Sequence, residues 1–264
     1  MDRRDFIKTT SAVAAMTGSG TSALLSAPPT QRQPDLIRVE NAKPGADFQL
    51  TRVRLDTRAG FRNSLIEGYA SRQSVKAGET LDLFVSTQPS SRFKIDVFRT
   101  GYYGGKGARL MTELGPFDGT PQPEPPAEDM RLRECVWEKT TSITIPDDWV
   151  SGVYLARLTT LPNQEPRTKN PEPYWQSYIV FIVTDDRPAD ILLQCSDNTW
   201  QAYNRWPDDY SIYTHPKGNQ GPWSKVSFDR PYAKYAQIYE NPQSIGSGEW
   251  LCFEFPLAYW LEEQ

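Results

Sequence analysis

The sequence predicts a mainly β fold: an N-terminal antiparallel sandwich followed by the start of an open α/β domain with a parallel sheet. Three observations predict it. Within residues 64–184, apolar and polar residues alternate in short runs separated by glycine, proline and serine, as in half-buried antiparallel strands. Residues 189–198 form a continuous apolar run that ends in polar residues, as buried parallel strands do. The amphipathic segment 251–264 then completes a strand–loop–helix unit.

Residues 1–27 have the order of a twin-arginine signal peptide. In MDRRDFIKTT, Arg3 and Arg4 precede a phenylalanine and a lysine, and a mildly apolar stretch and small residues follow. We expect export by the twin-arginine machinery, removal of about the first 27 residues and a periplasmic or secreted protein. A basic, alanine-rich start without this role is the alternative. Residues 28–63 are polar and contain several prolines, which favours a linker.

The sandwich is expected over residues 64–184. Its strands are the alternating runs LDLFVS (81–86), FKIDVFR (93–99), TSITI (141–145), GVYLARLT (152–159) and WQSYIVFIVTDD (175–186). Their alternation places five apolar side chains between two sheets: Leu83, Val85, Ile95, Val97 and Leu155. Proline-rich residues 115–130 predict a long surface loop, since a sheet interior excludes proline. Residues 161–173 predict a second loop, and GYYGGKG (101–107) predicts a hairpin connection.

Residues 185–264 are expected to begin the α/β domain. Its predicted strand is 189–195, and its predicted helix is 251–264, with Pro256 in the first turn or at a kink. The helix carries apolar side chains at Leu251, Leu257, Trp260 and Leu261. Because a parallel sheet needs further strands to cover its edges, we expect this domain to be incomplete in the chain.

Composition excludes several classes of protein. The 264 residues are 38% hydrophobic and 23% charged, as in globular proteins. A net charge of −4 argues against a nucleic-acid partner. The sequence contains no run of about 18 apolar residues, so it predicts no permanent membrane span. Cys135, Cys195 and Cys252 allow one disulfide at most, and their spacing matches no zinc site. We expect three buried thiols.

The segment SDNTWQAYNRWPDDYSIYTH (196–215) combines five large aromatic residues with the only histidine of the chain. It follows the predicted strand, where open α/β sheets bind their ligands. A tyrosine phenolate is a hard oxygen ligand that suits ferric iron. Burial in a core explains each aromatic side chain equally well. The pattern alone therefore leaves a metal site and an aromatic core open.

The same stretch carries a resemblance to a known family. The segments SGVYLARL (151–158), SYIVFIVTDDRPADILLQCSDNTWQAYNRW (177–206) and SIY (211–213) resemble the large (beta) subunit of N,N-dimethylformamidase and its exported relatives. The runs IEGYASRQSVKAGETLDLFVST and DVFRTGYYGGKGARLM are similar to the sandwich domain of that family. The resemblance covers about residues 64–264, and DNTWQAYN is its most specific part.

This resemblance implies a mononuclear iron amidohydrolase that acts on small linear amides, its metal held by two tyrosines and one glutamate. The first tyrosine falls on Tyr203, and the second falls on Tyr213, with Tyr210 as the alternative. The family's glutamate is expected in a later segment resembling HDEYW, and no such segment occurs here. Glu249 and Glu254 are not assigned as ligands. The resemblance thus implies a half-site, and we expect the 264-residue chain to bind iron weakly.

Four further residues are candidates for contact with substrate or with the metal ligands. Asp197 and Asn198 either orient substrate and iron-bound water or cap a loop as an Asx turn. Trp200, together with Trp206, is expected to wall the site from water. His215 is either a surface residue or a general base, so no catalytic residue is assigned.

A different class of function fits the same residues. The chain could be an exported, non-catalytic protein whose aromatic loop binds a small ligand, such as a sugar or a quaternary amine, by stacking and cation–π contact. The two functions differ in colour, because iron–phenolate charge transfer absorbs visible light and a plain binding protein does not.

The signal peptide gives the first prediction. Replacing Arg3 and Arg4 together by lysine should leave the precursor in the cytoplasm, because the paired arginines are the recognition feature of this route. Cell fractionation of the wild type and the double variant measures this. Unchanged export of the double variant would contradict the prediction.

Overall fold

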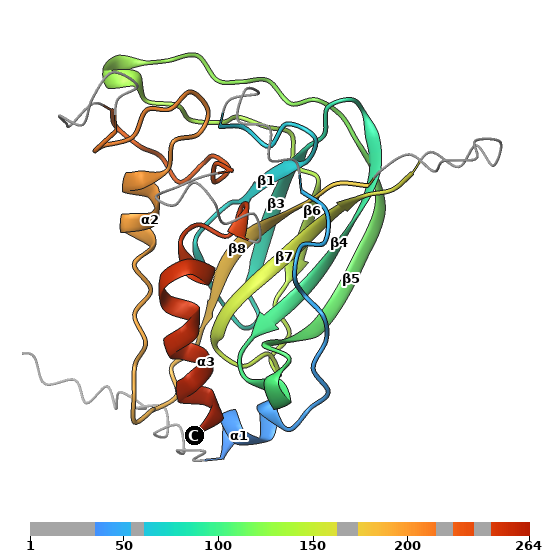
Figure 1. Cartoon of the computed structure of the whole chain (residues 1–264), viewed down its shortest axis with the longest axis vertical. Helices are drawn as coiled ribbons and strands as arrows, with labels where there is room; N and C mark the ends of the chain where they lie inside the picture. The colour runs from blue at the N-terminus through green and yellow to red at the C-terminus, as the bar shows by residue number, and fades with distance from the viewer. Residues whose placement is uncertain (1–34, 54–60, 163–173, 215–223, 235–243) are drawn as a thin grey trace, which may run out of the picture. The chain divides into compact units, whose positions relative to one another are not determined.

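Two β-sheets pack face to face in this computed structural model (Figure 1). The three-stranded sheet has the order β1-β3-β6 and consists of β1 (Glu67–Ala70), β3 (Thr80–Ser86) and β6 (Thr141–Thr144). The five-stranded sheet has the order β2-β8-β7-β4-β5 and consists of β2 (Ser74–Lys76), β4 (Ser91–Thr100), β5 (Ala108–Gly119), β7 (Gly152–Thr160) and β8 (Gln176–Thr184). Paired strands are antiparallel except β2 and β8. The predicted mainly β sandwich is confirmed.

The structure describes residues 35–53, 61–162, 174–214, 224–234 and 244–264, all within the unit Arg32–Gln264. The predicted signal peptide, most of the predicted loop 161–173 and His215 lie outside the described residues. In the part of the chain that the structure describes, no helix is long and apolar enough to cross a membrane.

The core between the two sheets follows from the alternation of the strands. Leu83 and Val85 of β3 and Ile95 and Val97 of β4 are at most 2% exposed and belong to one core cluster. Their predicted burial between the sheets is confirmed. Leu155 is fully buried too, but it lies in the cluster on the opposite face of the five-stranded sheet, so its predicted position between the sheets is wrong.

That opposite face is covered as completely as the inner one. Leu155, Tyr178 and Val180 project from β7 and β8 into a second core. The sheet also contributes Phe98, Ala108 and Val153 to this core. The segments before and after the sandwich supply the remaining side chains: Phe48, Leu50, Trp200, Tyr232, Ile245, Trp250 and Ala258. Because β8 is buried on both faces, its residues 178–183 are continuously apolar, so the alternation predicted for 175–186 is wrong there.

Residues 35–53 were expected to be part of a linker, and that expectation is wrong for them. They form α1 (Leu36–Asn41) and an extended segment that lies along the five-stranded sheet (Figure 1). Phe48 and Leu50 are 4% and 6% exposed. The stretch is mostly polar, but Phe48 and Leu50 are two residues apart, as are side chains on one face of an extended chain. Both belong to the second core.

The predicted strand 189–195 is not formed. The segment runs beside the C-terminal helices without pairing to any described strand (Figure 1), and Ile191 and Leu192 are 64% and 89% exposed. The parallel sheet of an α/β domain is therefore absent from the described residues. An apolar run shows that a segment suits burial, but a strand also needs a neighbour to satisfy its backbone N–H and C=O groups.

Three helical segments follow. They are α2 (Asp197–Tyr203), a π-helical turn η5 (Trp250–Glu254) and α3 (Phe255–Glu263). Pro256 lies in the first turn of α3, as predicted. Leu257 and Trp260 are 50% and 53% exposed, so the predicted apolar stripe of this helix faces solvent in part, while Ala258 and Phe255 contact the second core.

The loops of the sandwich agree with the sequence only in part. GYYGGKG forms the predicted hairpin connection between β4 and β5, with the short helix η2 (Tyr103–Gly105) at its tip and a hydrogen bond of 3.0 Å from Gly101 N to Gly107 O. The predicted loop 115–130 is wrong at its start, because β5 continues to Gly119. Pro116 is tolerated there since β5 is an edge strand. After β5, the rest of the predicted loop is irregular until the helical turn η3 (Asp129–Arg131).

A buried ion pair fastens α3 to this hairpin. The fully buried Arg99 donates from Nη1 to Glu262 Oε2 at 3.0 Å and from Nη2 to Glu262 Oε1 at 2.7 Å. Tyr103 Oη accepts from the same guanidinium at 3.0 Å and donates to Glu40 of α1 at 3.0 Å. Burial opposes ionisation of Glu40, but hydrogen bonds from Lys43, Arg109 and Tyr103 lower its pKa below the usual value.

The close approach of residues 244–248 to β8 gives a second prediction. Gly246 has a φ of 83°, and a Cβ atom at this position would overlap the carbonyl oxygen of Tyr178. Changing Gly246→Ala should lower the free energy of unfolding by about 3–5 kcal/mol, because it adds backbone strain and forces β8 apart from its cover. Urea unfolding measures the loss.

Gly104→Ala is the matched control. Gly104 also has a positive φ, 62°, but a Cβ atom there meets no other atom within 4 Å. Only the conformational penalty remains, about 1–2 kcal/mol. Equal losses for the two variants would contradict the proposed steric constraint.

Candidate functional site

The site is built around helix α2, whose first turn is fastened by Glu254. One oxygen of this carboxylate accepts the backbone N–H of Ser196 at 3.1 Å and the indole N–H of Trp200 at 2.9 Å. Trp200 is 1% exposed and packs against Trp250 and Tyr232. Glu254 thus holds the start of α2.

The turn after α2 is anchored on the sandwich. Trp206 is fully buried, and its indole N–H donates to Oε2 of Glu67 in β1 at 3.0 Å. The same carboxylate accepts from Arg62 Nε at 2.7 Å and from the backbone N–H of Asn63 at 3.1 Å. The aromatic ring of Trp206 packs in a third core cluster that includes Trp137. Trp206 therefore fixes where the chain leaves the helix.

The loop that carries Tyr213 is tied back to α2. The backbone N–H of Ile212 donates to the carbonyl of Ala202, in the last turn of the helix, at 3.1 Å. The hydroxyl of Ser211, a residue with no exposed surface, accepts from the backbone N–H groups of Tyr213 at 3.2 Å and Thr214 at 2.9 Å. These bonds define a turn that sets the position of Tyr213 relative to the helix end.

As a result, Tyr203 and Tyr213 are in contact. Their ring centroids are 4.9 Å apart, with an interplanar angle of 41°. Tyr203 is half-buried and Tyr213 is 52% exposed. Neither phenol hydroxyl is hydrogen-bonded to a residue that the structure describes. Tyr210, the alternative to Tyr213, lies under the guanidinium of Arg131, 4.1 Å from the ring centroid.

The other predicted site residues lie apart from this tyrosine pair. Asp197 and Asn198 occupy the first turn of α2, about 9 Å along the helix axis from Tyr203. The Asp197 carboxylate accepts the backbone N–H of Asn198 at 3.0 Å. Trp200 and Trp206 are buried, and their indole N–H groups donate to Glu254 and Glu67.

The donor set of the pair suits a hard metal ion. The phenol oxygens of Tyr203 and Tyr213 are hard donors without a partner among the described residues, and the two rings are in contact. The nearby acids are engaged, because Asp208 pairs with Arg133 at 2.7 Å and Asp209 pairs with Arg205 at 3.4 Å. Among the described residues, no group of three or more His, Cys, Asp and Glu side chains gathers to hold a metal. The tyrosine pair therefore offers two phenol oxygens as candidate metal donors.

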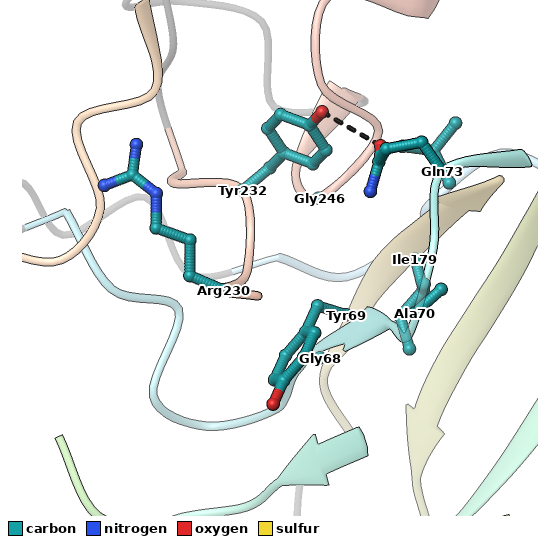
Figure 2. Close-up of a pocket in the computed structure, with 9 residues that line it drawn as sticks. Gly68, Tyr69, Ala70, Gln73, Ile179, Arg230, Tyr232 and Gly246 are labelled. Atoms are coloured by element: carbon teal, nitrogen blue, oxygen red, sulfur yellow. Dashed lines mark hydrogen bonds between the residues drawn. The ribbon is translucent and has the colours of Figure 1, made fainter. Parts of the chain in front are cut away.

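Sequence reasoning missed Arg230, which joins the end of α2 to the segment 224–234. The residue lines a cavity between β1, β8 and the C-terminal segment, together with Gln73 and Tyr232 (Figure 2). Tyr232 reaches across the cavity and donates to Gln73 Oε1 at 3.2 Å, whereas the Arg230 side chain turns away from β1 (Figure 2). The cavity volume of about 10 Å³ is that of one water site, so it is not a substrate pocket.

Comparisons with known proteins give one family. The family described as "N,N-dimethylformamidase beta subunit-like, C-terminal" matches residues 94–264. No curated protein matches the chain. Among solved structures, the extended catalytic domain of H. jecorina LPMO9A, also known as EG4, is 14% identical, with 81% of this chain and 93% of that chain covered and a TM-score of 0.28. A likeness this weak carries no functional argument.

The Trp206 anchor gives a third prediction. Replacing Glu67 by alanine removes the acceptor shared by Arg62, Asn63 and Trp206, and should cost about 3–5 kcal/mol of unfolding free energy, as expected when one partner of a buried ion pair is lost. Urea unfolding gives the free energy. Amide hydrogen exchange should rise across residues 204–214, which depend on this anchor.

Glu124→Ala provides the control, since Glu124 pairs with the same Arg62 but its side chain is 43% exposed. Its loss should change stability by no more than about 1 kcal/mol. An unchanged exchange rate at residues 204–214 in the Glu67 variant would refute the anchoring role.

Proposed function

Because the chain belongs to the N,N-dimethylformamidase beta subunit-like family, we propose that it is an iron-dependent hydrolase of small linear amides. The observation that supports this function most is the contact between Tyr203 and Tyr213. These are the two tyrosines that the family resemblance selects, and they come from separate segments that a helix-to-loop hydrogen bond holds together.

Tyr203 and Tyr213 would hold the iron. When bound, the ion supplies a Lewis acid that polarises the amide carbonyl and acidifies a water ligand. No third ligand is assigned, since the segment resembling HDEYW in which the family's glutamate is expected does not occur in this sequence.

The chain's own residues support this role by what they hold in place. The last turn of α2 fixes the Tyr203 ring, and the Ser211 turn fixes the Tyr213 ring against it. Half of Tyr213 remains exposed, which leaves one side of the pair open to a small substrate. Trp206 and Ser211 are fully buried and hydrogen-bonded, and they keep this frame rigid, so the two phenols need little reorganisation to share one cation.

A non-catalytic binding protein is the second candidate. A tilted pair of tyrosine rings with one ring half-exposed also suits a flat or cationic ligand, which would stack on the exposed ring. This function requires no metal and predicts a colourless protein that binds such ligands equally well after chelation.

Export belongs to the same proposal. The order of charged, apolar and small residues over positions 1–27 supports the twin-arginine route and a periplasmic or secreted location. Since that route carries folded proteins, iron would be bound before export.

Titration with ferric iron gives the fourth prediction. The wild-type chain should develop visible phenolate charge-transfer absorption, and Tyr203→Phe and Tyr213→Phe should each remove it and weaken binding by about tenfold or more. Phenylalanine keeps the ring and deletes only the ligand oxygen, so the ring contact itself should survive.

Tyr210→Phe is the control and tests the alternative ligand. Tyr210 stacks under Arg131, and its variant should keep the colour and the affinity. If Tyr210→Phe loses the colour and Tyr213→Phe keeps it, Tyr210 and not Tyr213 is the second ligand. A colourless wild type at saturating iron would overturn the metal site and favour the binding protein.

A further inference from the structure

Arg230 is a buried cation without a buried anion. The residue is 2% exposed, and no carboxylate in the described part of the chain forms an ion pair with it. Burial lowers the pKa of its guanidinium to about 10, so it is still charged at neutral pH. Burying a charge is costly unless hydrogen bonds satisfy it. The hydrogen-bond acceptors around Arg230 therefore indicate which part of the chain its guanidinium stabilises.

Those acceptors cluster at the C-terminal end of α2. Arg230 Nη2 donates to the carbonyl of Gln201 at 3.4 Å and to that of Asn204 at 3.2 Å, while Nη1 donates to the carbonyl of Trp206 at 2.7 Å. The last carbonyls of a helix have no partner within the helix. A guanidinium binds several of them at once because its donors form a rigid planar fork. Tyr203 lies between the first two of these acceptors in the chain.

The side chain of Asn204 completes the arrangement. Asn204 has no exposed surface. Its Oδ1 accepts the backbone N–H groups of Trp206 at 3.2 Å and Ala233 at 3.0 Å, and its Nδ2 donates to Gln201 Oε1 at 3.0 Å and Pro231 O at 2.9 Å. Residues 230–233 thus hold both the backbone and the side chains on either side of Tyr203.

We propose that Arg230 is a positioning residue that, with Gln201 and Asn204, clamps the end of α2 so that the Tyr203 ring stays against the Tyr213 ring. The clamp acts on Tyr203 through the carbonyls of its neighbours. It acts on Tyr213 through the same helical turn, because Ala202 O accepts the backbone N–H of Ile212. The significance of the pair rests on the proposed iron site, but the ring contact can be measured without any metal.

Dityrosine cross-linking measures that contact directly. A ruthenium photosensitiser with persulfate couples tyrosine rings that touch, and peptide mapping by mass spectrometry identifies each coupled pair. The protein contains an internal reference in Tyr102 and Tyr259, whose ring centroids are 5.2 Å apart and which belong to the hairpin and α3. Wild-type protein, free of iron, should yield both cross-links.

Arg230→Met should lower the yield of the Tyr203–Tyr213 cross-link about tenfold relative to the Tyr102–Tyr259 cross-link. Methionine fills part of the volume, but it donates no hydrogen bond, and released helix ends populate other conformations. The reciprocal control is Arg99→Met, which removes the guanidinium that holds Glu262 of α3 to the hairpin. It should lower the Tyr102–Tyr259 cross-link and leave the Tyr203–Tyr213 cross-link unchanged.

A variant that retains the charge covers the case in which Arg230→Met does not fold. Arg230→Lys keeps a cation and most of the stem, but its compact ammonium group lacks the planar spread of donors with which the guanidinium reaches the three carbonyls. It too should lower the Tyr203–Tyr213 yield selectively. A folded Arg230→Met or Arg230→Lys protein with the wild-type ratio of the two cross-links would overturn the clamp.

Ferric iron titration of the same variants separates this inference from the proposed function. If the wild type binds iron, Arg230→Lys should bind it more weakly, by about the factor that a supporting hydrogen-bond partner contributes, tenfold to a hundredfold. If the wild type binds no iron while the cross-link ratios change as expected, the clamp stands and the iron site fails.

Discussion

The whole architecture depends on one constraint: the five-stranded sheet is apolar on both faces, so both faces must be covered. The three-stranded sheet covers one face with the core that contains Leu83 and Ile95. Nothing within the sandwich covers Leu155, Tyr178 and Val180 on the other face. Residues 46–53 and the C-terminal segment do so, and removing that apolar area from water is the main favourable term that holds them there. Helix α2, whose last residue is Tyr203, contributes Trp200 to this cover.

Apolar burial draws the cover onto the sheet but does not fix its geometry, and buried polar groups supply that. Glu67 binds Trp206, Glu254 binds Trp200, and Arg230 binds the end of α2. Each joins α2 or the turn after it to a different element, and each has an acceptor or donor that would be costly to leave unpaired in the interior. Three ties at separate points leave a short helix little freedom to shift. This polar frame holds the Tyr203 ring where the Tyr213 loop can meet it.

How much the sequence predicted depends on whether the information is local. Period-two alternation placed Leu83, Val85, Ile95 and Val97 correctly, because alternation along one strand determines which side chains share a face. It misplaced Leu155, since a strand buried on both faces gives no sign of which face is inner. The apolar run 189–195 indicated burial but could not reveal whether a neighbouring strand exists. Arg230 had no local signal at all, because its acceptors lie about thirty residues earlier in the chain. Family resemblance supplied Tyr203 and Tyr213, and only the folded chain could bring their rings together.

The distinction between an aromatic core and an aromatic site rests on how the polar atoms are used. The indole groups of Trp200 and Trp206 are buried and donate to carboxylates, and Tyr232, also buried, donates to Gln73, so these residues are structural. Tyr203 and Tyr213 differ on both counts, since they are incompletely buried and their hydroxyls have no described protein partner. The surrounding hydrogen bonds therefore place the two rings without engaging their own hydroxyls in the described part of the chain. That contrast within one short segment argues against packing as the sole role of the pair.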